Sequence, residues 1–139
     1  MKKLPVFIIF LFGLLSCQGS KDNKNDTFIV GKWAIYETIA FQNNDDSAAM
    51  HCNVCPQIVF IKNHTGFAKL SNQKPIYFNW EFDDGKLVIE HTENKTKDNI
   101  LDDGKYQITY TRVVYIHKKM FNEIALSDSE TNKKYVLRR

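Results

Sequence analysis

A strict alternation of apolar and polar side chains over residues 75–82 constrains the fold of this chain more than any other feature. Ile76, Phe78, Trp80 and Phe82 would lie on one face of an extended segment, and the residues between them would lie on the other. This period of two is typical of a β-strand with one buried face, whereas an amphipathic helix repeats its apolar residues every three to four positions. The pattern therefore predicts a sheet protein.

Seven further segments are extended and rich in β-branched and aromatic residues, which favour strands. Asp83-Asp84-Gly85-Lys86 is the strongest hairpin signal, because Asp-Gly fits a tight turn with positive φ. Asn63-His64-Thr65-Gly66 is a second turn, in which we expect Gly66 to take the positive φ. The eight predicted strands cover residues 28–41, 57–62, 67–70, 75–82, 87–91, 105–118, 122–128 and 133–139.

The connections between the predicted strands determine how they assemble. No long amphipathic helix separates them in the sequence, so parallel β-α-β units are not expected. An open meander would leave two strand edges exposed, and closure into a barrel removes both. We therefore predict an all-β fold, an antiparallel up-and-down meander barrel of eight strands. Its interior could hold either packed side chains or one small ligand, and the sequence leaves both open.

The first sixteen residues have the pattern of a secretory signal peptide. Lys2 and Lys3 are followed by an apolar run at residues 4–15 and then by the small residue Ser16. The run has about 12 residues, whereas a helix needs roughly 20 to span a bilayer. A cleaved signal is therefore predicted rather than a permanent transmembrane helix.

Leu14-Leu15-Ser16-Cys17, at the end of that run, resembles the lipobox of bacterial lipoproteins. The resemblance implies cleavage before Cys17 and attachment of acyl chains, such as palmitate, to that cysteine. More than one chain gives stable membrane anchoring. Because the next residue is Gln18 rather than Asp, the resemblance implies the outer membrane, so we expect a lipid-anchored protein of the cell envelope. The alternative is an ordinary signal peptide with a chance cysteine.

Residues 17–27 are predicted to be the lipidated cysteine and a flexible tether, and residues 28–139 the barrel domain. The segment 18–26 contains no apolar residue, which is typical of a solvated linker. Removal of residues 1–16 takes away two of the 19 basic residues and none of the 16 acidic ones. The mature chain is then close to neutral, which argues against nucleic acid as a partner.

Gly31-Lys32-Trp33, at the start of the first predicted strand, is similar to the Gly-X-Trp signature of lipocalins. The chain ends in a strand that carries Arg138 and Arg139. In lipocalins an arginine from the last strands packs over that tryptophan and closes the barrel, a favourable cation–π contact. The resemblance implies a lipocalin-like barrel that binds a small apolar or amphipathic ligand. The chain is shorter than a typical lipocalin and lacks the long C-terminal helix of that family.

Cys52-Asn53-Val54-Cys55 has four interpretations. A redox site would open a helix, where the dipole lowers the thiol pKa, but Pro56 and a predicted strand follow. A haem attachment site needs His where Pro56 stands. A zinc site needs four ligands, and only His51 and the two cysteines are local. In an oxidising compartment a short structural disulfide between Cys52 and Cys55 is the interpretation that we predict.

Two charged residues interrupt predicted faces that are otherwise apolar. Glu37 shares its face with Ile35, and Arg112 shares its own with Tyr110. Inside a barrel such charges are costly unless they are paired, so they would anchor a ligand, form a structural ion pair or lie on an exposed face near a strand end. The residues predicted to line a ligand pocket are Glu37, Phe78, Trp80, His91, Tyr110 and Arg112, with plain core packing as the alternative for the aromatic ones.

The sequence carries no Gly-X-Ser-X-Gly, no phosphate-binding glycine loop and no His-Glu-X-X-His motif. We therefore predict no enzyme, no cofactor and no metal site. The main hypothesis is a lipid-anchored barrel that binds a small apolar or amphipathic ligand. The alternative is a filled barrel that acts as a protein-interaction or inhibitor module through its loops at residues 43–53 and 92–104. The predicted partners are thus the membrane, through lipid on Cys17, and either a small hydrophobic ligand or a protein.

Overall fold

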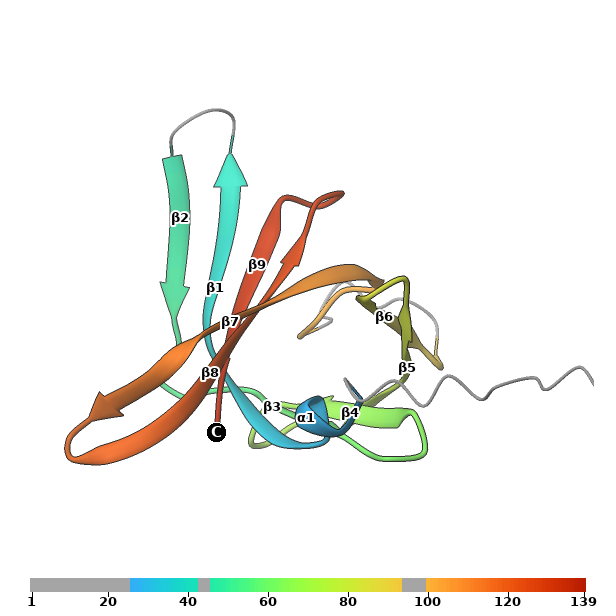
Figure 1. The fold of residues 1–139 in the computed structure, drawn as a ribbon, viewed down its shortest axis with the longest axis horizontal. Coiled ribbons are helices and arrows are strands. Elements are labelled where there is room, and N and C mark those ends of the chain that lie inside the picture. The colour runs from blue at the N-terminus through green and yellow to red at the C-terminus, as the bar shows by residue number, and fades with distance from the viewer. Residues whose placement is uncertain (1–25, 43–45, 94–99) are drawn as a thin grey trace, which may run out of the picture.

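The computed structural model describes residues 26–42, 46–93 and 100–139, with the side chains of residues 26, 42, 46–48, 111 and 112 excepted. The predicted signal peptide, Cys17 and most of the predicted tether lie outside the described residues. Within them the chain is almost entirely extended (Figure 1). The elements are α1 (Asp26–Ile29), β1 (Gly31–Gln42), β2 (Asp46–His51), β3 (Gln57–Phe60), β4 (Thr65–Lys69), β5 (Ile76–Asp83), β6 (Lys86–His91), β7 (Gly104–Ile116), β8 (Lys119–Asp128) and β9 (Lys133–Arg138).

The strands form one antiparallel sheet that closes on itself. Consecutive strands pair from β3 to β9, and β1 pairs with both β3 and β9. β1 and β3–β9 therefore make a closed eight-stranded barrel, and the predicted all-β antiparallel meander barrel is confirmed. The predicted β5–β6 hairpin turn is also present, with φ of 50° at Asp84 and 74° at Gly85.

β2 is a ninth strand that the sequence pattern did not predict. One edge of β1 serves two partners: Gly31–Ala34 pair with β3, and Glu37–Gln42 pair with β2. β2 and β3 therefore follow one another along β1, with Cys52–Pro56 between them. The β1–β2 hairpin extends beyond the barrel (Figure 1). Because β2 lies outside the barrel, it has no inner face to fill, and its sequence lacks the alternation that marks the other strands.

Two β-bulges interrupt the strands that carry the charged residues Glu37 and Arg112. In β1, Ile35 opposes Leu137 but Glu37 opposes Val136, so the extra residue Tyr36 turns Glu37 to the outer face. A second bulge lies in β7, where Tyr110 opposes Ile124 but Arg112 opposes Glu123. Adjacent residues of a strand point to opposite faces, so one inserted residue reverses every later position. Glu37 therefore lies on the outer face, where its carboxylate is close to His51, and this fits the alternatives of an exposed face or an ion pair rather than an interior ligand anchor.

The two ends of the barrel carry different elements. α1, the C-terminal residue Arg139 and the far part of the β7–β8 hairpin lie at one end, the α1 end (Figure 1). The β4–β5 turn, the segment before β7 and the β8–β9 turn lie at the opposite end, the mouth. The β1–β2 hairpin projects on the mouth side.

Large side chains fill the barrel between these ends. Phe60 packs edge-on against Phe78 and Trp80, with ring centroids 5.5 and 5.7 Å apart. The core is completed by Trp33, Ile58, Leu87, Ile89, Leu101, Tyr106, Ile124, Leu126 and Leu137, each at most 2% exposed. Burial of this apolar surface is the main driving force for closing the sheet. The interior is therefore a packed core, which is the filled alternative left open by the sequence.

Candidate binding site at the mouth of the barrel

A groove of about 400 Å³ opens at the mouth, beside the loop that joins β2 to β3. Its wall includes Ile35 of β1, Leu70 of the β4–β5 turn and Ile100 of the segment before β7. Met50 and Val54 also line it, and these two side chains are 71% and 59% exposed. Large apolar side chains that stay in water beside an apolar groove are typical of a binding surface.

The loop beside the groove is held by the predicted disulfide between Cys52 and Cys55, whose Cα atoms lie 4.9 Å apart. Two backbone hydrogen bonds tie it to β1: the N–H of Ile35 donates to the carbonyl of Pro56 over 2.9 Å, and the N–H of Cys52 donates to the carbonyl of Tyr36 over 3.2 Å. The loop is thus fixed at both ends and across its base. This restraint holds Val54 in its exposed position at the groove.

A polar pair lies at one side of the groove. The bulge that turns Glu37 outward places its carboxylate 3.7 Å from the Nε2 atom of His51, its register partner on β2. The His51 ring also meets the edge of Tyr36, with centroids 5.8 Å apart. His51 is largely exposed. The groove therefore combines an apolar wall with two neighbouring polar groups, the Glu37 carboxylate and the His51 ring, that a bound group could reach.

Asp102 secures the segment that carries Ile100 to the mouth. Its carboxylate accepts hydrogen bonds from Lys133 Nζ at 2.6 Å and from the Tyr135 hydroxyl at 3.0 Å, and its backbone carbonyl accepts one from the Tyr106 hydroxyl at 2.6 Å. Burial raises the pKa of both tyrosines, and the neighbouring Asp102 raises them further. Both hydroxyls therefore stay protonated and act as donors.

Three residues predicted to line a ligand pocket have side chains that are almost fully buried, although Trp80 and His91 also border hollows on the side wall. Phe78 and Trp80 are at most 2% exposed. The His91 side chain is also 2% exposed, and its Nδ1 atom lies against the carboxylate of Asp103, which accepts the His91 backbone N–H at 2.7 Å as well. These side chains fill the barrel and hold the start of β7 against β6, and they do not reach the mouth groove.

The two C-terminal arginines have different contacts. The Arg139 guanidinium lies 4.4 Å from the Trp33 ring, in the arrangement that the lipocalin resemblance implies, and donates to the carbonyl of Val30 over 2.9 Å. Arg138 points to the outer face, where Nε donates to Glu123 over 2.6 Å and the guanidinium lies 3.5 Å from the Tyr36 ring. Arg139 is thus the residue that covers Trp33 at the α1 end, and Arg138 fastens the outer wall.

Tyr110 and Arg112, the remaining predicted pocket residues, lie toward the α1 end. Tyr110 is exposed and contacts Phe28 of α1, with centroids 4.8 Å apart. The side chain of Arg112 is outside the described part of the chain. Of the predicted pocket set, Glu37 alone reaches the mouth groove. Met50, Val54, Leu70 and Ile100 were missed, and the available signal was that Met50 and Val54 are large apolar residues in and directly after the polar connection at residues 43–53.

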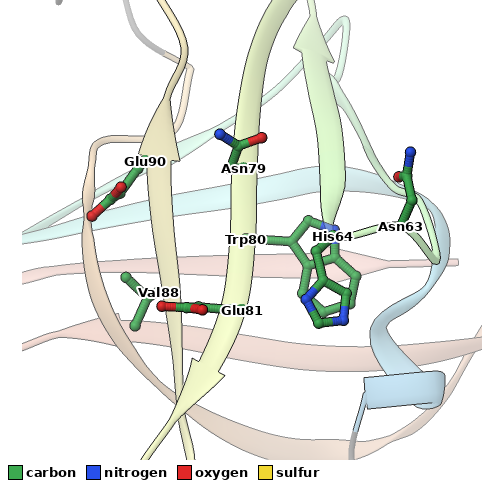
Figure 2. Close-up of a pocket in the computed structure, with 7 residues that line it drawn as sticks. All are labelled: Asn63, His64, Asn79, Trp80, Glu81, Val88 and Glu90. Atoms are coloured by element: carbon green, nitrogen blue, oxygen red, sulfur yellow. The ribbon is translucent and has the colours of Figure 1, made fainter.

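A second hollow, of about 280 Å³, lies on the side wall where the β3–β4 turn meets β5 and β6 (Figure 2). His64 stacks on Trp80 at 4.9 Å, and the Trp80 indole N–H donates to the carbonyl of Thr65 over 2.9 Å. Figure 2 shows Glu81 and Glu90 on the other side of the hollow. The stacking and the hydrogen bond fix the turn to the wall, which is a structural role.

Comparison with known proteins adds no relative: no family model, curated protein or solved structure matches this chain. In the part of the chain that the structure describes, no group of three or more His, Cys, Asp or Glu side chains could hold a metal ion. Over the same residues, no helix is long and apolar enough to cross a membrane.

Proposed function

We propose that this chain is a lipid-anchored binding module of the bacterial cell envelope that recognises a partner protein through the groove at the barrel mouth. The observation that carries the proposal is the packed interior, which leaves the surface to bind a partner. The groove, with Met50 and Val54 exposed at its side, is the apolar surface best suited to that role. The proposed role is non-enzymatic.

The position of the groove suits a protein held by lipid on Cys17. α1 begins nine residues after that cysteine and lies at the end of the barrel opposite the mouth. Nine extended residues reach about 30 Å. A chain anchored in this way has the mouth on the side away from the tether, where a partner can approach it.

The free edge of β2 is the proposed attachment point for a strand of the partner protein. Among the described strands, β2 is the one at the end of the sheet order, with β1 as its neighbour on one side. An unpaired edge presents backbone donors and acceptors to an incoming strand, and side-chain pockets beside it give specificity. We propose that a strand of the partner adds to β2 and places an apolar side chain in the groove next to Val54.

Photo-crosslinking in the native host tests this proposal. A benzophenone amino acid in place of Met50 should give one discrete adduct with a protein, because this side chain borders the groove. The same amino acid in place of Tyr77, an exposed residue on the β5 wall, is the matched control and should not give that adduct. Absence of an adduct from the Met50 position, or the same adducts from both positions, would contradict the proposal.

The lipid anchor has its own test. Cys17→Ser removes the acceptor of the acyl chains, and we expect the protein to move from the membrane fraction to the soluble fraction. Ser16→Ala keeps the cysteine and a small residue before it, and should leave the protein with the membranes. Membrane retention of the Cys17→Ser protein would contradict lipid attachment at this residue.

A small amphipathic ligand in the same groove is the second candidate function. Its volume of about 400 Å³ lies within the range of small-molecule sites. Glu37 and His51 would supply the polar contacts beside the apolar wall. A bound molecule that is retained by the natural chain and lost from Glu37→Gln would favour this candidate over the partner protein.

A further inference from the structure

The far part of the β7–β8 hairpin extends beyond the barrel wall. β7 pairs with β6 through Gly104–Tyr106 alone, whereas its pairing with β8 continues to Ile116 and Lys119. β8 in turn pairs with β9 only as far as Asn122, which exchanges two backbone hydrogen bonds with Arg139. Residues 113–121 therefore form a two-stranded arm that projects at the α1 end (Figure 1). Its tip is the tight turn His117-Lys118, whose φ values are 47° and 66°.

One face of the arm continues the inner face of the barrel into the open. The bulge after Tyr110 places Val113 and Tyr115 on the side of the buried residue Ile124. Tyr115 opposes Met120 across the arm, and these side chains are 75% and 63% exposed. Val113 opposes the polar residue Asn122 at the base of the arm. Cross-strand neighbours on one face act as one surface. The outer part of the arm therefore presents an exposed apolar surface of Val113, Tyr115 and Met120 that its own barrel does not cover.

The arm is also basic. From Tyr106 to Asn122 the chain has no acidic residue, and it carries Arg112, Lys118 and Lys119 together with His117 at the tip. Lys118, Lys119 and His117 are exposed. An apolar face that ends in lysines suits an anionic lipid surface. Its apolar side chains can enter the interfacial region of the bilayer while the lysine ammonium groups remain next to the lipid phosphates.

The base of the arm lies against the segment that leads to the proposed lipid. Phe28 of α1 contacts Tyr110 at 4.8 Å, and both line a groove of about 340 Å³ with Val113 at the start of the arm. The tether from Cys17 thus enters the fold beside the arm, and its reach of about 30 Å keeps the arm near the lipid surface.

We propose that the β7–β8 arm binds an anionic bilayer, with Tyr115, Met120 and Val113 in the headgroup and upper acyl region and Lys118 and Lys119 on the lipid phosphates. The orientation of the barrel on the bilayer rests on the proposed anchor at Cys17, whereas the affinity of the arm for anionic lipid does not depend on that anchor. A lipid anchor and a second membrane contact acting together fix the orientation of the protein on the bilayer, which one lipid anchor does not. With the arm on the bilayer, the mouth groove faces away from it.

The test uses residues 18–139 without lipid, which contain every described strand and the whole closed barrel. Vesicles of phosphatidylcholine with phosphatidylglycerol are compared with phosphatidylcholine alone. We expect co-sedimentation with the anionic vesicles that weakens as salt rises. Tyr115→Ser together with Met120→Ser should lower the partition coefficient at least about tenfold.

The control is Tyr77→Ser together with Phe41→Ser, which removes two exposed apolar side chains away from the arm and should not change vesicle binding. Tyr115→Trp adds a reporter, because Trp33 and Trp80 are buried. Its emission should shift to the blue on addition of anionic vesicles. Lack of binding by the natural chain, equal loss in both double variants, or an unshifted emission would overturn the proposal. Dimerisation through the arm without vesicle binding would overturn it as well.

Failure of the vesicle test and failure of the anchor are distinguishable, because the vesicle test needs no lipid on Cys17. Release of the Cys17→Ser protein from membranes reports on the anchor. The vesicle partition of residues 18–139 reports on the arm.

Discussion

At the scale of single residues, Gly66 shows how closely the core is packed. It lies in β4 between Phe60 and Phe78 of the neighbouring strands. A Cβ atom built at this position would lie 2.4 Å from the Phe78 ring and 2.6 Å from the carbonyl oxygen of Val59. The sequence suggested a turn glycine here, but the positive φ of that turn belongs to His64. Gly66 is required for close packing rather than for the turn.

Gly66→Ala should therefore lower the free energy of unfolding by about 1–3 kcal/mol, because the ring and a backbone carbonyl must both move. Urea denaturation followed by tryptophan fluorescence measures the change. Lys69→Ala, on the same strand with a half-buried side chain, is the control and should cost less. An unchanged midpoint for Gly66→Ala would show that the space between β4 and Phe78 is larger than the structure has it.

Tyr106 and Tyr135 make the stability of the barrel depend on pH. Burial is the main reason that the pKa of each tyrosine lies well above the ordinary value. The neighbouring Tyr135 raises the pKa of Tyr106 further, and Asp102 raises the pKa of Tyr135 further. Because the folded pKa is raised, these groups contribute stability that is complete below the unfolded pKa of about 10 and is lost as pH rises above it.

Titration of the phenolate absorbance checks this. We expect two of the six tyrosines to remain protonated until the barrel unfolds in alkali. Tyr135→Phe should reduce the number that ionise late to one. Ionisation of all six near the ordinary value, with the fold intact, would contradict the buried cluster around Asp102.

At the scale of elements, the Cys52–Cys55 loop joins two strands that share one edge of β1. We expect the intact mass of the oxidised chain to lie two hydrogens below that of the reduced chain. Cys52→Ser together with Cys55→Ser should cost about 2 kcal/mol or less, because the closed loop is short. The same change should increase protease cleavage between β2 and β3. Free thiols on the native protein would contradict this prediction.

The elements also show what the sequence could and could not predict. Alternation and turn residues are local signals, and they were enough for the eight barrel strands and for the turn at Asp84-Gly85. The bulges at Tyr36 and near Arg112 were not predicted, because the apolar residues of the sequence continue the same alternation across each bulge, as Ile39 and Phe41 do after Ile35. β2 was missed because its partner is the backbone of β1 rather than a core that would require alternating side chains. The mouth groove was missed because its walls come from loops that are distant in the sequence and meet only in the fold.

At the scale of the whole molecule, the two ends of the barrel have different proposed functions: membrane attachment at the α1 end and partner binding at the mouth. The α1 end brings together the tether, Arg139 over Trp33 and the basic arm. The mouth brings together the disulfide loop, the β1–β2 hairpin and the apolar groove. The packed core between them makes the barrel a rigid spacer.

Native mass spectrometry of residues 18–139, purified gently after periplasmic expression, tests the filled barrel most directly. We predict a single mass that equals the chain with one disulfide and carries no small molecule. A reproducible additional mass that leaves on denaturation would contradict the proposal that the protein binds a partner protein and no small ligand. It would favour a barrel, or a mouth groove, that holds a small ligand.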